Sequence, residues 1–279
     1  MMVKSLKYIF VPIIMLLLFV TTGMTTKVQA ATTENYEPTL FFHGWGSSSH
    51  AEQQMASSLL KAGVSKTIIK ATVSKSGQVT MNGTFNRKDR HPIVEVEYKD
   101  NKNMSSQNWG HWAKNVIKQL QKTYHIKKFN MVGHSMGNMA IVFYLLNNDQ
   151  NKSLPKLDRQ VDIAGHFNGI LGMNDSPNKM KLTANGKPEK MDSEYRELLS
   201  LRKTYPKNQV RVLNIYGDKN DGTHSDGSVS NASSKSLRYL ISNRAKSYQE
   251  RKIIGKSASH SKLHENKQVD RYLIQFLKN

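Results

Sequence analysis

The sequence contains no cysteine, and this absence limits how the protein is stabilised and attached. Disulfides are excluded, even in an oxidising compartment that would permit them. A lipid-modified cysteine near the N-terminus is excluded for the same reason. About 250 residues remain after a short leader, enough for a large apolar core, so we expect one domain that needs no cross-link.

Apolar stretches long enough to cross a bilayer are also lacking at the N-terminus. The run from Ile9 to Val20 is shorter than the roughly 20 residues that a membrane span needs. It follows the basic residues Lys4 and Lys7 and precedes Val28-Gln29-Ala30, the pattern of a cleavage site. We predict a secretory signal peptide over residues 1–30, with an uncleaved anchor as the alternative. The remaining domain, residues 31–279, is expected to be secreted or associated with the cell envelope.

Acidic residues are few: 21 Asp and Glu stand against 41 Lys and Arg, for a formal net charge of +20. Removal of Lys4, Lys7 and Lys27 with the leader leaves +17. Such a charge attracts polyanions. The lysines are scattered, without a compact basic run or a basic–aromatic repeat, so we expect no nucleic-acid partner. The charge indicates electrostatic association with an anionic cell wall or membrane surface.

The order of apolar segments predicts an α/β fold, with a mainly parallel sheet covered by helices on both faces. Predicted strands cover residues 37–42, 68–73, 78–85, 92–98, 127–132, 160–164, 210–216 and 248–254. Predicted helices include residues 55–60, 109–120, 138–146, 233–240 and 269–277. The polar, lysine-rich segment 172–206 is a candidate lid over the site, with an ordinary crossover loop and helix as the alternative.

The most informative motif is Gly133-His134-Ser135-Met136-Gly137, between a predicted strand and a long apolar helix. G-x-S-x-G at a strand-to-helix junction is typical of a nucleophile elbow. The turn is so tight that its two outer positions have no room for a Cβ, and glycine occupies both. We therefore predict that Ser135 is a nucleophile whose hydroxyl projects above the sheet.

A serine nucleophile needs a base and an acid that orients the base. After this elbow, the acid follows a later strand and the histidine comes last. Three aspartates follow the strand at 210–216: Asp218, Asp221 and Asp226. We favour Asp226, which lies in an Asp-Gly-Ser-Val turn before a helix. Asp218, nearest the strand end, is the alternative.

The predicted base is His260, the first histidine after the last predicted strand, with His264 as the alternative. Two possible metal sites in this region fit poorly. Asp218, Asn220 and Gly222 break the register of a calcium loop, and the histidine pair lacks the glutamate of the H-E-x-x-H zinc motif. We therefore expect no metal and no other cofactor.

An oxyanion formed at the site requires backbone N–H donors. The first predicted donor is Met136, the residue after the nucleophile. The second is Trp45, in the loop His43-Gly44-Trp45-Gly46 that follows the first predicted strand. The two glycines allow this loop to approach a substrate closely.

Together these residues resemble the α/β-hydrolase superfamily. Three segments are similar to the secreted hydrolases of Gram-positive bacteria grouped as a family of unknown function, DUF915: Phe42 to Gly46, Ser225 to Val229 and His260 to Asn266. The resemblance covers essentially the whole chain after the leader. It implies an α/β-hydrolase fold, a Ser-His-Asp triad and a lipase-like elbow, and it names no substrate.

The function expected from these residues is a serine hydrolase acting on carboxylic esters, a small molecule or a lipid, through an acyl-enzyme. An amidase, a peptidase or an acyltransferase acting on envelope material is the alternative within enzymes, because all of them use the same triad. Outside enzymes, the alternative is an envelope-binding protein that keeps the fold for its basic surface.

Overall fold

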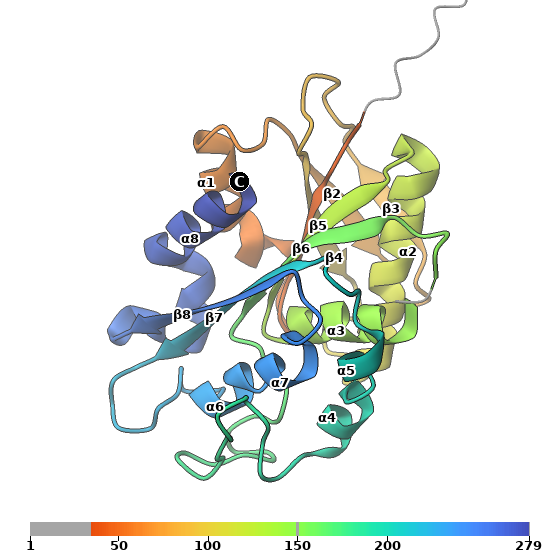
Figure 1. Cartoon of the computed structure of the whole chain (residues 1–279). Helices are drawn as coiled ribbons and strands as arrows, with labels where there is room; N and C mark the ends of the chain where they lie inside the picture. Colours follow the sequence, from red (N-terminus) through yellow and green to blue (C-terminus); the bar gives the residue numbers. More distant parts are fainter. Residues whose placement is uncertain (1–34, 149–150, 279) are drawn as a thin grey trace, which may run out of the picture. The chain divides into compact units, whose positions relative to one another are not determined.

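The computed structural model describes residues 35–148 and 151–278 (Figure 1). They belong to one compact unit, Thr33–Asn279. The predicted signal peptide, residues 1–30, lies outside the described residues. No helix in the described ranges combines the length and the apolar character that crossing a membrane requires.

An eight-stranded sheet forms the centre of the fold, in the order β3-β2-β4-β1-β5-β6-β7-β8. The strands are β1 (Thr39–Phe42), β2 (Ile68–Val73), β3 (Val79–Asn82), β4 (Ile93–Tyr98), β5 (Lys128–His134), β6 (Lys156–Ile163), β7 (Arg211–Asp218) and β8 (Ser247–Ile254). Neighbouring strands are parallel except for β2 and β3, which pair antiparallel. The predicted, mainly parallel α/β architecture is confirmed.

Helices cover both faces of the sheet (Figure 1). They are α1 (Gln53–Lys61), α2 (Ser106–Tyr124), α3 (Met136–Asn148), α4 (Ser193–Leu198), α5 (Leu201–Thr204), α6 (Asn231–Lys235), α7 (Leu237–Ile241) and α8 (Lys267–Lys278). Short 3-10 turns form η1 (Ser49–Glu52), η2 (Lys256–Ala258) and η3 (His260–Glu265). Helices α1 and α8 pack on one face, and α2 and α3 pack on the other.

The central strands are buried on both faces, which explains their unbroken apolar sequences. In β1, Leu40 and Phe42 join the apolar cluster under α2 and α3, whereas Phe41 joins the cluster under α1 and α8. A strand with alternate side chains in two cores must be apolar throughout. The sheet is therefore covered on both faces where it carries the candidate site.

The structure differs from the predicted elements mainly at β6, which begins at Lys156, four residues before the predicted start. The first residues of this strand are mostly polar, and Arg159 pairs there with Asp158 (2.7 Å) and Glu37 (3.5 Å). A search for apolar segments therefore missed the start of β6. The predicted helix 233–240 is two short helices, α6 and α7, separated at Ser236.

Gly137, at the start of α3, has no space for a side chain. A Cβ there would lie 2.0 Å from the carbonyl oxygen of Phe42, a backbone atom of β1. We expect Gly137→Ala to destabilise the fold by at least about 3 kcal/mol, because neither backbone segment can move aside. Urea unfolding of the variant measures this loss.

The matched control for this substitution is Gly63→Ala. Its added Cβ meets no atom within 4 Å, and only the left-handed backbone, with φ of 70°, opposes it. That substitution should cost about 1 kcal/mol. Equal losses at Gly137 and Gly63 would contradict the close approach of β1 to the elbow.

A buried polar cluster lies between β6 and β7. Gln160 Nε2 donates to both carboxyl oxygens of Asp162 (3.1 and 2.9 Å), and the Tyr205 hydroxyl donates to Gln160 Oε1 (2.9 Å). Asn214, in register with Asp162 on β7, has a side-chain oxygen with no hydrogen-bond partner among the described residues. Burial raises the pKa of Asp162 to about 7, although the Gln160 hydrogen bonds oppose this rise.

This raised pKa predicts that stability falls as the pH rises. The pKa of an unfolded aspartate is near 3.9, whereas the pKa of folded Asp162 is about 7. Between these two pH values the unfolded chain has lost the Asp162 proton and the folded chain keeps it. The free energy of unfolding therefore falls with a limiting slope of about 1.4 kcal/mol per pH unit. Asp162→Asn, which cannot ionise, should lack this component. Urea unfolding of both proteins between pH 4 and pH 8 tests this, and parallel pH profiles would show that Asp162 ionises normally.

Candidate active site

Ser135 occupies the turn between β5 and α3. Its φ of 53° lies in the left-handed region, which is uncommon for a residue with a side chain. A Cβ on Gly133 would lie 2.7 Å from the carbonyl carbon of Gly137, so the turn closes only with glycine at this position. The Ser135 N–H donates to the Ile163 carbonyl at the end of β6 (3.0 Å). The backbone geometry is that of a strained strand-to-helix elbow.

Asn138, on the first turn of α3, fixes the elbow to β6. Its Nδ2 donates to the carbonyls of Ser135 (2.9 Å) and Ile163 (2.8 Å), and its Oδ1 accepts from the Ile163 N–H (3.2 Å). Sequence analysis did not single out this residue. A fully buried asparagine in an otherwise apolar helix was the available signal, because a buried amide requires partners.

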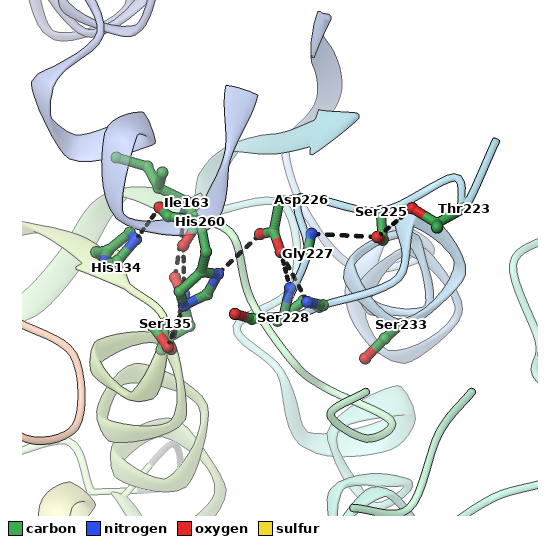
Figure 2. A network of polar contacts seen from close by, with 12 residues as sticks. His134, Ser135, Ile163, Thr223, Ser225, Asp226, Gly227, Ser228, Ser233 and His260 are labelled. Carbon is green, nitrogen blue, oxygen red and sulfur yellow. Dashed lines mark hydrogen bonds and ion pairs between the residues drawn. The ribbon is translucent and has the colours of Figure 1, made fainter. Parts of the chain in front are cut away.

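The imidazole of His260 joins Ser135 to Asp226 (Figure 2). Nε2 lies 2.8 Å from Ser135 Oγ, and Nδ1 lies 2.8 Å from Asp226 Oδ2. Because a carboxylate only accepts, Nδ1 carries the hydrogen and Nε2 is left to accept from the serine hydroxyl. The structure therefore brings the three predicted residues into one hydrogen-bonded chain.

Asp226 is held rigidly in its turn. Its Oδ1 accepts from the backbone N–H groups of Ser228 (2.8 Å) and Val229 (2.7 Å), as Figure 2 shows for this loop. Its own carbonyl accepts from the His260 N–H (2.9 Å). Asp226 and His260 are thus joined by a backbone hydrogen bond as well as by the bond between their side chains.

The other two aspartates of this region have different partners. Asp218 bonds to Lys252 (2.6 Å) and to Asn231 (2.9 Å). Burial opposes ionisation of Asp218, but these bonds outweigh it and lower the pKa to about 2. Asp221 is paired with Lys219 (2.8 Å) at the surface. Neither has a hydrogen bond to a histidine of the site, although His224 lies 3.6 Å from Asp218.

The alternative base, His264, packs against His134. Its ring centre is 5.0 Å from that of His134, and its buried Nδ1 has no hydrogen-bond partner within the described ranges. Burial lowers its pKa, so His264 is uncharged near neutral pH. The described hydrogen bonds do not connect it with Ser135.

His134 connects the elbow to the loop that carries His260. Its Nε2 donates to the His260 carbonyl (3.0 Å), and the two rings lie 4.9 Å apart (Figure 2). Burial, followed by the neighbouring histidines His260 and His264, lowers the pKa of His134 well below its usual range. A neutral His134 can therefore anchor His260 without placing a second positive charge beside it.

The loop after β1 lies directly against the nucleophile turn. A Cβ on Gly44 would lie 3.1 Å from Ser135 Cβ. His43 fixes this loop, since its Nδ1 donates to the Gly44 carbonyl (2.8 Å) and its Nε2 accepts from the Tyr98 N–H (3.1 Å). Burial lowers the pKa of His43, which keeps the ring neutral in this role.

Of the two predicted oxyanion donors, Met136 follows Ser135 directly in sequence, and Trp45 belongs to the loop after β1 that packs against the nucleophile turn. Met136 is the first residue of α3, where the N–H groups have no carbonyl partner within the helix. Trp45 follows Gly44, and its indole Nε1 donates to the Lys102 carbonyl (2.9 Å), which ties the loop to the segment after β4. Their role as donors stays a prediction.

A cavity of about 510 Å³ opens beside Ser135 and His260. Trp45, Met104 and Met173 line it, and they are three of the large apolar side chains that the described surface exposes. Its other lining residues are Ser106, Met136, His166, Gly169, Ile170, Asn174, Asp192 and Glu194. The cavity is therefore lined by exposed apolar side chains and by polar side chains.

One lining residue of this cavity, His166, was not recognised as such in the sequence. His166, three residues beyond β6, is buried at the cavity wall, and burial lowers its pKa to about 4. Its place after the carboxyl end of a parallel strand was the available signal. The candidate lid, residues 172–206, supplies Met173, Asn174, Asp192 and Glu194 to the wall, so it borders the cavity, and its role as a lid stays a prediction.

Within the described ranges, no group of His, Asp and Glu side chains is arranged to hold a metal ion. The polar groups at Ser135 are instead hydrogen-bonded to one another. The arrangement is suited to proton transfer between a hydroxyl and an imidazole that a carboxylate orients.

Comparison with known structures identifies similar folds. The lin2722 gene product of Listeria innocua has a TM-score of 0.78 at 24% identity, over 88% of this chain and 95% of that one. A candidate cell surface hydrolase of Lactobacillus plantarum has a TM-score of 0.65 at 23% identity, over 87% and 92%. Est1E from Butyrivibrio proteoclasticus has a TM-score of 0.50 at 13% identity, over 88% of each chain. These similarities show the fold.

No curated protein matches the chain in sequence. The family described as "Alpha/beta hydrolase of unknown function (DUF915)" matches residues 26–279, nearly the whole length. The expectation from the three similar segments is thereby confirmed, and the chain belongs to the DUF915 family of α/β hydrolases.

Proposed function

We propose that this protein is a serine hydrolase that cleaves carboxylic esters through an acyl-enzyme. The observation that carries the proposal is the hydrogen-bonded chain from Ser135 through His260 to Asp226 at the wall of a cavity. An unactivated serine hydroxyl is a poor nucleophile, and such a chain supplies its activation.

In the proposed reaction, Ser135 Oγ attacks the ester carbonyl carbon while His260 Nε2 takes the hydroxyl proton. Asp226 stabilises the imidazolium, and the N–H groups of Trp45 and Met136 stabilise the oxyanion. Collapse of the tetrahedral intermediate breaks the bond to the alcohol, which leaves with the proton from His260. Water then attacks the acyl-enzyme with His260 as base, releasing the acid and free Ser135.

Esters are proposed over amides on two grounds. The elbow is lipase-like in sequence, and the exposed apolar side chains of Trp45, Met104 and Met173 in the cavity lining favour a substrate with an apolar acyl or alkyl group. The amidase, peptidase and acyltransferase alternatives share the same groups. The non-catalytic alternative leaves the strained Ser135 and its hydrogen bonds without a purpose.

Hydrolysis of matched substrates tests the proposal. We expect p-nitrophenyl esters with acyl chains of two to eight carbons to be cleaved at least about 100-fold faster than the corresponding p-nitroanilides, with Ser135→Ala as the background control. Faster anilide cleavage would favour the amidase alternative. Absence of cleavage of both series above that background would favour the non-catalytic one.

Two further parts of the proposal concern location and access. Residues 1–30 act as a signal peptide, so the protein works outside the cell or at its envelope; the name of the Lactobacillus neighbour agrees with such a location. N-terminal sequencing of the exported protein tests this location.

Residues 172–206 act as a lid, because this segment supplies part of the cavity wall. Protection of the segment from proteolysis by a bound inhibitor tests this role.

A further inference from the structure

Lysines gather at the amino ends of four neighbouring strands, β5 to β8, which are consecutive in the sheet. The segments that enter these strands are residues 125–128, 151–157, 206–210 and 243–247, and none of them contains Asp or Glu. Their exposed lysines are Lys127, Lys128, Lys152, Lys156, Lys207 and Lys246. We call these six residues the basic edge.

The four segments form one continuous surface, because hydrogen bonds connect each to the next. These bonds are Lys156 N–H to Lys127 carbonyl (2.9 Å), Gln209 Nε2 to Leu157 carbonyl (2.9 Å), Asn208 N–H to Arg244 carbonyl (2.7 Å) and Lys246 N–H to Val210 carbonyl (2.8 Å). Lys128 and Lys156 are also direct register partners on β5 and β6. Adjacent strands lie about 4.8 Å apart, so the lysines are closely spaced.

Among the described side chains, none neutralises the charge of the basic edge. None of its six lysines forms an ion pair with another described residue. Asp158, which follows residues 151–157, is already paired with Arg159 (2.7 Å) and Arg211 (2.9 Å). Closely spaced cations without such pairs create a positive potential that attracts external anions.

The basic edge lies at the opposite end of β5 from Ser135. The seven residues of this strand span about 20 Å, so an occupant of the edge does not obstruct the cavity. No large apolar side chain is exposed in the four segments, whereas Trp45, Met104 and Met173 are exposed at the cavity. Proteins that settle into a lipid surface combine basic residues with apolar anchors, which the basic edge lacks.

We propose that the basic edge binds a linear, phosphate-bearing polyanion and leaves the cavity facing away from it. Lysine ammonium groups are mobile point charges, which suit a flexible chain of phosphates better than a single fixed ligand. The inference concerns a surface away from Ser135 and does not depend on the proposed ester hydrolysis.

The test compares two variants of equal net charge in residues 31–279, which include the whole compact unit. The edge variant replaces Lys127, Lys128, Lys156 and Lys207 with Gln. The control variant replaces Lys75, Lys179, Lys181 and Lys190, exposed lysines outside the basic edge, with Gln. Binding of inorganic polyphosphate is measured by titration at several salt concentrations, and the melting temperature of each variant verifies its fold.

We expect the edge variant to bind polyphosphate at least tenfold more weakly, and the control variant less than threefold more weakly. The slope of log K against log salt is negative, and its magnitude should be smaller by about 3 in the edge variant. Each of the four lost phosphate contacts removes about 0.7 from that magnitude. Equal weakening in both variants would overturn the proposal, because binding would then follow net charge alone.

Two further measurements keep the proposal testable if a variant is unstable. In the wild type, polyphosphate should protect the lysines of the basic edge from acetylation more than Lys179 and Lys181, as read by mass spectrometry; equal protection would overturn the proposal. Vesicles of phosphatidylglycerol, compared with phosphatidylcholine, give the second measurement. Binding to the anionic vesicles without binding to polyphosphate would identify a membrane surface as the partner and overturn the polymer.

Discussion

Ser135→Ala is expected to lower kcat/KM for p-nitrophenyl esters by at least about 10⁴-fold, leaving only the residual catalysis that substrate binding and the oxyanion donors supply. The substitution removes the attacking oxygen, which lies 2.8 Å from His260 Nε2. His260→Ala should cause a similar loss, because the hydroxyl then has no base. Steady-state kinetics with the same ester measure both.

The double variant lacking both Ser135 and His260 tests whether the two groups act as a unit. Its activity should fall no further than that of either single variant, since groups of one mechanism are not additive. His264→Ala is the matched control, because this histidine lies outside the hydrogen-bonded chain. A loss at His264 equal to that at His260 would mean that the base has been misassigned.

The second large effect is expected at the acid. Asp226→Asn should lower kcat by about 10³- to 10⁴-fold, because an amide in this position can donate to Nδ1 and favour the wrong tautomer of His260. The Ser228 and Val229 N–H groups, which bond to Asp226 Oδ1, can still bond to the amide oxygen. The fold should therefore be kept, and circular dichroism with thermal melting checks this.

Asp218→Asn distinguishes the two acids that sequence alone left as alternatives. It removes the charge beside Lys252 and has no direct contact with His260, so kcat should change by less than about threefold. If Asp218→Asn lost as much activity as Asp226→Asn, or if Asp226→Asn kept full activity, the assignment of Asp226 would be wrong.

The features that sequence predicted well depend on local order along the chain. The elbow is encoded in five consecutive residues between an apolar strand and an apolar helix, so its backbone follows from steric exclusion at Gly133 and Gly137. The alternation of strands and helices predicted the parallel sheet for the same reason, because each element has its own periodicity.

The choice between Asp218 and Asp226 could not be settled from sequence, because it depends on the path of a loop. Asp218 ends β7, where the register places it beside β8 and therefore within reach of Lys252. Asp226 reaches His260 because its own turn, in which the Ser228 and Val229 N–H groups bond to Oδ1, leaves Oδ2 beside His260 Nδ1.

Residues that support the site were missed because their partners are distant in sequence. His134 and His260 are 126 residues apart, and the bond between them exists only once β5 and the last loop are assembled. Similarly, Asn138 joins the carbonyl of Ser135, in the nucleophile turn, to that of Ile163 on β6, which is 25 residues away in the sequence. The clustering of positive charge was missed for the same reason. The lysines are scattered along the sequence, and the order of the strands in the sheet brings six of them together in the basic edge.

The central claim is that Ser135 is activated as a nucleophile, and a fluorophosphonate probe tests it most directly. The probe reacts with activated serines by forming an Oγ–phosphorus bond and releasing fluoride. We predict one adduct per protein, located by peptide mass spectrometry on Ser135 and abolished by His260→Ala. A folded wild-type protein that stays unlabelled, or that is labelled on another serine, would contradict the account.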